Sequence, residues 1–176
     1  PVPLVLQGTR FVMAEAPSAA SVAKSLEALK VGEVLERDQA PQVAKRLLTI
    51  TAEVHSESAD GVILAHGGNT TGYALYLRSG QLFFTVRENK KLFTISSPEK
   101  CGDQFKVEAR LRSGGEMVLA INGSTAAQGK AAGLLPVQPQ EHFCLGFDDE
   151  QPVGDYPADS RFQGQITWLN ISTDEL

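Results

Sequence analysis

Strict alternation of apolar and polar residues constrains the fold of this 176-residue chain more than any other feature. In residues 48–54 (LTITAEV) an apolar side chain occupies every second position. Residues 105–111 (FKVEARL) repeat the pattern, so that Phe105 at the start and Leu111 at the end share one side. Because successive side chains of a strand point to opposite faces, both segments are predicted to be strands with one buried and one solvated face.

Further strand-like segments follow at short intervals, separated by turn residues. Residues 61–66 form a continuous apolar run, which predicts a strand covered on both faces. Residues 73–77 and 81–87 are typical of a hairpin, and Asn122-Gly123 is typical of a type I′ turn. The other predicted strands are residues 92–96, 117–121, 142–147 and 165–171. About nine strands spaced by roughly 8–12 residues, with no helix between them, predict an all-β fold: an antiparallel two-sheet jelly-roll sandwich.

The beginning of the chain lacks this pattern. Ser18 is a favourable helix N-cap, and apolar residues at i, i+4 and i+7 from Val22 fall on one helical face. We therefore expect a short N-terminal helix over about residues 18–31. The predicted organisation is an extension over residues 1–39 and one β-sandwich over residues 40–176.

Composition excludes several classes of function. The net charge is −5, whereas nucleic-acid binding needs a basic stripe, so no nucleic-acid partner is expected. No segment approaches the ~18 consecutive apolar residues of a membrane span. Cys101 and Cys144 lack the CxxC spacing of zinc fingers and thioredoxins. We favour two free thiols, with Cys144 buried in a strand, while a disulfide stays open because pairing cannot be deduced from sequence.

An ordered series of short motifs resembles the concanavalin A-like, laminin-G-like β-sandwiches, and more narrowly the C-terminal sandwich of bacterial arylsulfatases. The resemblance covers about residues 40–172. It is carried by DGVILAHGG (60–68), GYALYL (72–77), GQLFF (80–84), the hairpin ending in NG (114–123), LGFD (145–148) and FQGQI (162–166). It implies a bacterial, periplasmic or extracellular protein. The C-x-P-x-R motif that carries sulfatase chemistry is absent, because Cys101 is followed by Gly102, Asp103 and Gln104.

The sequence offers no recognisable catalytic constellation. Retaining glycosidases need two carboxylates about 5–5.5 Å apart. The strand-borne acids Glu53, Glu108 and Glu116 each stand alone on a predicted strand, and no E-x-D-x-x-E arrangement occurs. A G-x-S-x-G nucleophile elbow is also absent, and the three histidines are scattered. We therefore expect no catalytic residues.

An acidic loop over residues 148–161 is the one candidate metal site. Calcium is bound by six to eight oxygens from carboxylates and carbonyls. Asp148, Asp149 and Asp155 are the candidate calcium ligands, and the alternative is a solvated acidic turn. No D-x-D-x-D-G loop is present to specify the ion. No other cofactor is expected.

Carbohydrate binding requires an exposed aromatic ring together with hydrogen-bonding side chains. The candidate ligand-binding residues are His66, Asn69, Tyr76, Arg87 and Tyr156. Tyr156, in the acidic loop, is the favoured aromatic platform. Trp168 lies inside the last predicted strand, where we expect it to belong to the core.

These observations predict a non-catalytic carbohydrate-binding or accessory module of an exported sulfatase or other carbohydrate-active enzyme. Its partner would be a glycan or the catalytic domain of the parent chain. One alternative is a structural domain that packs on a neighbouring domain and has no ligand of its own. A second alternative is a glycoside hydrolase of the concanavalin A-like superfamily.

Overall fold

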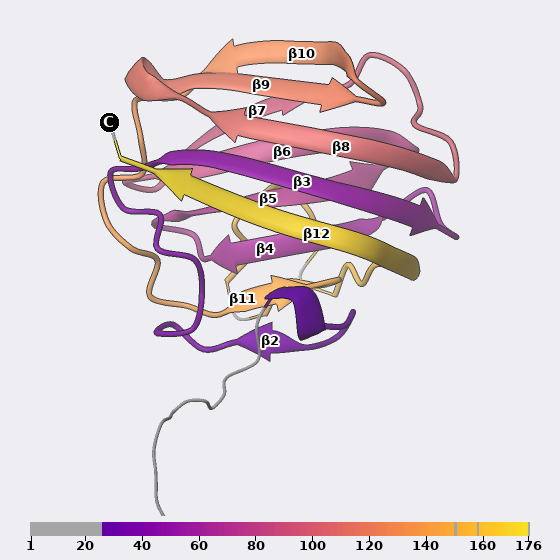
Figure 1. Cartoon of the computed structure of the whole chain (residues 1–176), viewed down its shortest axis with the longest axis horizontal. Helices are drawn as coiled ribbons and strands as arrows, with labels where there is room; N and C mark the ends of the chain where they lie inside the picture. The colour runs from indigo at the N-terminus through magenta and orange to yellow at the C-terminus, as the bar shows by residue number, and fades with distance from the viewer. Residues whose placement is uncertain (1–25, 150, 158, 176) are drawn as a thin grey trace, which may run out of the picture.

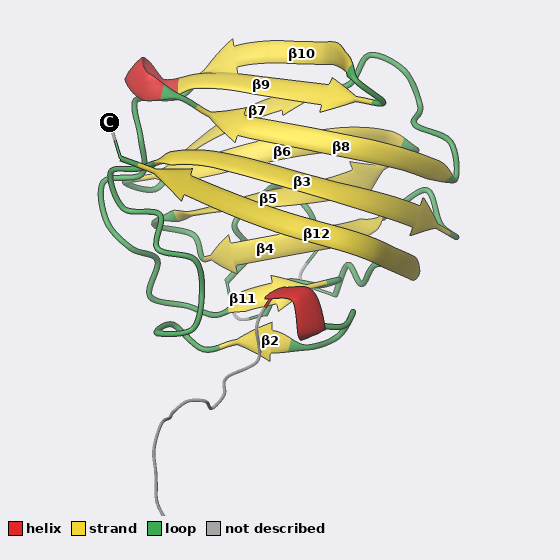
Figure 2. Ribbon diagram, viewed as in Figure 1, coloured by secondary structure: helices red, strands yellow, loops and turns green. Residues whose placement is uncertain are grey.

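Two antiparallel sheets stack face to face in the computed structural model, which describes residues 26–149, 151–157 and 159–175 (Figures 1 and 2). The five-stranded sheet has the order β10-β9-β8-β3-β12, and the six-stranded sheet has the order β2-β11-β4-β5-β6-β7. The five-stranded sheet consists of β3 (Leu47–Ser56), β8 (Gln104–Leu111), β9 (Glu116–Ile121), β10 (Ser124–Lys130) and β12 (Gly164–Asp174). The six-stranded sheet consists of β2 (Val34–Leu35), β4 (Gly61–Gly67), β5 (Gly72–Arg78), β6 (Gln81–Glu88), β7 (Lys91–Ser96) and β11 (Phe143–Leu145).

The chain crosses repeatedly between the sheets, as in a jelly roll. It leaves β3 for the four consecutive strands β4 to β7 of the other sheet, returns for β8, β9 and β10, and then contributes β11 to one sheet and β12 to the other. Every pairing between these strands is antiparallel. The predicted all-β, two-sheet sandwich is therefore confirmed.

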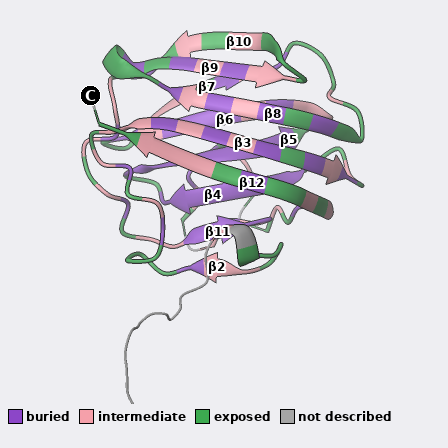
Figure 3. Cartoon of the chain, viewed as in Figure 1, coloured by how far each residue is buried: buried purple, intermediate pink, exposed green. Residues whose placement is uncertain are grey.

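The core lies between the sheets and is built by the predicted alternation. In β3 and β8 every second side chain is buried, and Figure 3 shows the alternating colours along these strands. Leu48 pairs with Leu111, and Ala52 pairs with Val107, so the buried side chains of the two strands lie side by side. The inward-facing residues include Ile50, Val54, Leu64, Tyr73, Leu75, Phe84, Phe105 and Phe143.

Three tight hairpins use left-handed backbone conformations. Ser79-Gly80, Asn89-Lys90 and Asn122-Gly123 each place two successive residues at positive φ, from 49° to 84°. This geometry matches type I′ turns, whose twist suits antiparallel strands. The hairpin and turn predicted from sequence are confirmed, and Asn89-Lys90 is a third turn of this kind that lacks glycine.

A long loop covers the outer face of the six-stranded sheet. Val153 of this loop packs against Val62, Ala65, Ala74 and Tyr76 in a second apolar cluster outside the main core. The loop is tied down where the Val62 amide donates to the Ser160 carbonyl, 3.0 Å away. This cover explains why β4 is buried along its whole length, as its continuous apolar sequence predicts.

The N-terminal region differs in detail from expectation. Most of the predicted helix over residues 18–31 lies outside the described residues. Within them, a single 3₁₀ turn, η1 (Leu26–Ala28), precedes residues without helical structure. The sheet includes β2, which pairs with β11 and lies before the predicted start of the sandwich at residue 40. Among the described residues, no helix is long and apolar enough to cross a membrane.

Candidate functional site

His66 is buried inside the core rather than exposed at a strand exit. Its side chain is 0% exposed, and its Nδ1 lies 2.8 Å from the Tyr73 hydroxyl. The ring also packs edge-on against Phe143. Burial lowers the pKa of His66 to about 3, so the ring is neutral at physiological pH. His66 therefore supports the core and is not accessible to a ligand.

Asn69 and Arg87 lie at the loop that covers the six-stranded sheet. The exposed Asn69 amide donates to Gln151 Oε1 at 3.4 Å, and the Arg87 Nε donates to the Val153 carbonyl at 2.9 Å. Arg87 also donates to the Lys90 carbonyl. These two hydrogen bonds of Arg87 hold the loop in place. They occupy part of the hydrogen-bonding capacity of the Arg87 side chain.

Tyr76 and Tyr156, two of the candidate ligand-binding residues, lie together at a surface depression of about 540 Å³ that also includes Asp155 and Arg78. Their ring centroids are 4.8 Å apart in an edge-on arrangement. Tyr76 is only 2% exposed, however, because it stacks on Phe83 and lies beneath the loop. The Tyr76 ring therefore presents no open face of the kind that stacks on a sugar, whereas Tyr156 is partly exposed.

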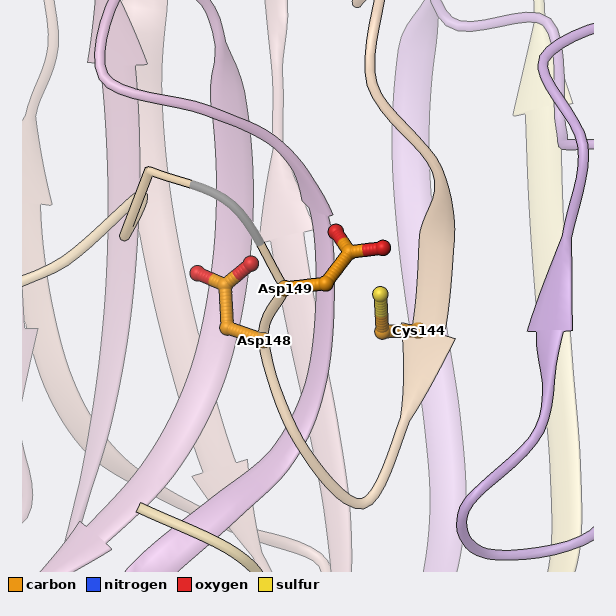
Figure 4. A group of neighbouring side chains, drawn as sticks. All are labelled: Cys144, Asp148 and Asp149. Carbon is orange, nitrogen blue, oxygen red and sulfur yellow. The ribbon is translucent and has the colours of Figure 1, made fainter. Parts of the chain in front are cut away.

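The three predicted calcium ligands do not form one site. Asp148 and Asp149 lie next to Cys144, and one ligand atom from each of the three residues lies within 4.8 Å of the others (Figure 4). Asp155 is not part of this group. Its exposed carboxylate lies 3.5 Å from the Arg78 guanidinium. Val153, which lies between Asp149 and Asp155 in the chain, packs against the six-stranded sheet.

Asp148 is the most perturbed carboxyl group of this region. Its Oδ2 accepts hydrogen bonds from the Val153 amide at 2.9 Å and from the Tyr156 hydroxyl. Burial raises the pKa of Asp148 to about 6, partly opposed by these two hydrogen bonds. Burial also raises the pKa of the Cys144 thiol well above its ordinary value. Both cysteines are free, as predicted, and Cys144 is buried in β11.

Trp168 is exposed, which corrects the expectation that it belongs to the core. Its side chain is 46% exposed on the outer face of the five-stranded sheet. A β-bulge between Ile166 and Trp168 is the physical reason. The extra residue at the bulge lets both Ile166 and Leu169 face the core, while Trp168 points outward.

Polar side chains surround Trp168 on this outer face. In the strand register Trp168 lies opposite Glu53, which in turn lies opposite Lys106. The next rung holds Asn170, Thr51 and Glu108. Figure 1 shows β12, β3 and β8 side by side at the front of the molecule, so these rungs form one continuous surface. We call it the Trp168 face, defined by Thr51, Glu53, Lys106, Glu108, Trp168 and Asn170.

A depression of about 390 Å³ adjoins the Trp168 face. Five polar residues line it together with Glu53, and it is therefore suited to hydrogen-bond a hydroxylated ligand. The lining residues are Glu53, Val54, His55, Gln104, Phe105, Lys106, Asn122 and Thr167.

The same face brings two carboxylates together that sequence reasoning kept apart. Glu53 on β3 and Glu108 on β8 are diagonal neighbours, since Glu53 pairs with Lys106 two residues from Glu108. Glu108 forms an ion pair with Arg110, and neither glutamate is buried.

The fold is an antiparallel two-sheet β-sandwich of the jelly-roll type. No family model and no curated protein matches its sequence. Among solved structures it is similar to domains LG4-5 of the mouse laminin α1 chain, with a TM-score of 0.63, 19% identity and coverage of 78% of this chain and 38% of that chain. It is also similar to the CBM40 of the Ruminococcus gnavus IT-sialidase, with a TM-score of 0.60, 18% identity and coverage of 73% and 76%.

A third similar structure is the binding domain of botulinum neurotoxin serotype D, with a TM-score of 0.57, 17% identity and coverage of 77% of this chain and 34% of that chain. The chain thus spans about a third of the laminin and toxin chains and three quarters of the CBM40 chain. At these identities the likeness establishes a shared fold.

Proposed function

We propose that this chain is a non-catalytic carbohydrate-binding module, and that glycans bind to the Trp168 face. The observation that carries this proposal is the exposed Trp168 ring, which lies in the interior of a strand beside a row of hydrogen-bonding side chains. It is the only tryptophan of the chain. Exposed aromatic rings bordered by polar groups are typical of ligand-binding surfaces.

The energetics favour an apolar, flat ligand surface against this ring. Covering about 100 Å² of exposed ring is worth roughly 2.5 kcal/mol, or nearly two orders of magnitude in Kd. One face of a pyranose ring is a patch of C–H groups, whereas its rim carries hydroxyls. The C–H face would stack on Trp168, and the hydroxyls would bond to Lys106, Glu53 and Asn170.

The depression at Tyr76 and Tyr156 is the alternative place for a glycan on this molecule. Its aromatic rings are committed to packing, and the Tyr156 hydroxyl already donates to Asp148. The Arg78 guanidinium beside it is paired with Asp155. These existing contacts favour the Trp168 face.

Two proteins of similar fold with known glycan or ganglioside interactions support a binding role. The CBM40 of the Ruminococcus gnavus IT-sialidase was solved with α2,3-sialyllactose bound. Botulinum neurotoxin type C, which has a similar fold, depends for cell entry on interaction with two ganglioside molecules. The proposal extends this kind of binding to the present chain.

The proposed context is an exported carbohydrate-active enzyme, with a bacterial sulfatase as the specific proposal. It rests on the sequence motifs that resemble the C-terminal sandwich of arylsulfatases. The catalytic domain of such an enzyme would be the second partner of this chain, and the location would be periplasmic or extracellular.

A glycan array probed with the labelled chain tests the proposal. The array should carry neutral, sialylated and sulfated oligosaccharides. We expect retention on at least one class, loss of at least ten-fold in affinity for Trp168→Ala, and an unchanged affinity for the matched control Arg78→Ala at the other depression. Equal losses in both variants would reject the Trp168 face, and no retention on any class would favour the structural-domain alternative.

A further inference from the structure

A thiol and two carboxylates converge where β11 leaves the six-stranded sheet. Cys144 lies on β11, and after a turn at Gly146, where φ is 83°, Asp148 and Asp149 fold back beside it (Figure 4). One ligand atom from each of the three side chains lies within 4.8 Å of the other two. With small side-chain shifts, one ion can contact all three.

Two carboxylate oxygens in this group are buried without a hydrogen-bond donor. Asp148 is only 7% exposed, and its Oδ1 has no partner among the described residues, while its Oδ2 accepts from Val153 and Tyr156. The Oδ1 of Asp149 is likewise buried and unpartnered. Buried carboxylate oxygens without donors are costly, and a bound cation would offset this cost.

A histidine fixes the orientation of one of these carboxylates. His142 Nδ1 lies 2.6 Å from Asp149 Oδ2, and its Nε2 lies 3.2 Å from Glu36 Oε2. The contact with His142 therefore holds the Asp149 carboxylate in one orientation. Histidine and carboxylate partners of this kind orient the ligands of protein metal sites.

The donor set selects the class of cation. Calcium is bound by six to eight oxygens, and a thiol is not among its ligands. Zinc and similar divalent ions are bound in tetrahedral geometry by thiolate and carboxylate ligands, often with water in the fourth position. The thiol at Cys144 thus makes this group unlike the three-aspartate calcium site expected from sequence, and unlike the CxxC pattern of common zinc sites.

We propose that Cys144, Asp148 and Asp149 bind one divalent cation of the zinc class, with His142 as the positioning residue for Asp149. Binding releases the thiol proton to solvent, and the thiolate, two carboxylate oxygens and a water molecule complete the coordination. The ion would fasten the covering loop, which begins at Asp148, to β11. This site is independent of the Trp168 face and does not rest on glycan binding.

Cobalt titration of the chelator-treated chain tests the site directly. Co²⁺ substitutes for Zn²⁺ and gives thiolate-to-cobalt charge-transfer absorption only when sulfur is a ligand. We expect one equivalent to produce this absorption, and Zn²⁺ to displace it. Titration without charge-transfer absorption overturns the proposal, as does tighter binding of Ca²⁺ than of Zn²⁺.

Matched variants assign the ligands. Cys144→Ser should abolish the charge-transfer absorption, whereas Cys101→Ser, which changes the other free cysteine, should leave it unchanged. Asp149→Asn should weaken Zn²⁺ binding at least ten-fold, and Asp155→Asn, in the same loop, should not. If Cys144→Ser does not fold, the Asp149 and Asp155 pair still decides, because both side chains are partly or fully exposed. Equal affinities for these two variants overturn the assignment.

Discussion

Trp168 on β12 lies directly opposite Glu53 on β3, and the β-bulge just before Trp168 is what turns the indole ring to the outer face of the sheet. Directly opposed side chains on neighbouring strands have Cβ atoms about 4.5–5.5 Å apart. The aromatic ring and a hydrogen-bonding carboxylate are thus held at a fixed separation by two paired backbones. A rigid sheet can place both groups against one sugar ring without ordering a loop.

His66 should make the fold sensitive to acid. The unfolded chain protonates this histidine near pH 6.5, whereas burial keeps the native pKa near 3, so between these values the unfolded state binds one more proton. The free energy of unfolding should therefore fall by about 1.4 kcal/mol per pH unit from this group as the pH drops from 6 to 4. Denaturant unfolding of the wild type and His66→Gln across this range measures the difference in slope.

The comparison with His66→Gln is needed because Asp148 acts in the opposite direction. Its native pKa of about 6 means that the native state binds more protons than the unfolded state between about pH 4 and 6. Both proteins share that contribution, so it cancels in the difference. Identical slopes for the wild type and His66→Gln would show that His66 is not buried as described.

Gly164 should be required by the close approach of two backbones. A Cβ added there would lie 2.1 Å from the His55 carbonyl oxygen, and the residue has φ of 138°. Gly164→Ala should lower the free energy of unfolding by about 2 kcal/mol or more, through both the clash and the strained backbone. Gly133→Ala is the matched control, since nothing lies within 4 Å of its added Cβ, and it should change stability by less than about 0.5 kcal/mol. Similar values for the two variants would contradict this packing.

Lys90 offers a stabilising substitution. It occupies the second position of the type I′ turn between β6 and β7, with φ of 72°, a conformation that costs an L-residue about 1–2 kcal/mol. Lys90→Gly should raise the free energy of unfolding by about 0.5–1 kcal/mol in chemical denaturation. Lys91→Gly, at the start of β7, should instead lower it. A loss of stability in Lys90→Gly would mean that the turn is not of this type.

Strands with alternating apolar and polar residues, or with a continuous apolar run, could be predicted from sequence. In these strands the polarity of each side chain follows from the sheet face that it occupies. β10 gives no such signal, since its residues are mostly exposed or partly exposed at a sheet edge. β2 contains only two residues. Both segments form strands because they pair with neighbouring strands, and their own residue pattern does not indicate a strand.

The candidate sites depended on features that a linear pattern does not contain. The bulge before Trp168 shifts the phase of alternation by one residue, and nothing in the residues 164–170 requires it. The neighbours Glu53 and Lys106 come from separate strands. Cys144 joins Asp148 and Asp149 through the turn at Gly146, and a cysteine four residues before paired aspartates is the signal that could have suggested it.

Tryptophan fluorescence can show whether a glycan binds at Trp168, because Trp168 is the only tryptophan of the chain. The chain should be titrated with the oligosaccharide retained most strongly on the array. We predict a saturable blue shift whose midpoint equals the Kd measured independently by calorimetry, without hydrolysis of the oligosaccharide. Calorimetric binding that leaves the emission unchanged would place the glycan away from Trp168 and contradict binding at the Trp168 face. Release of shorter oligosaccharides would contradict a non-catalytic function.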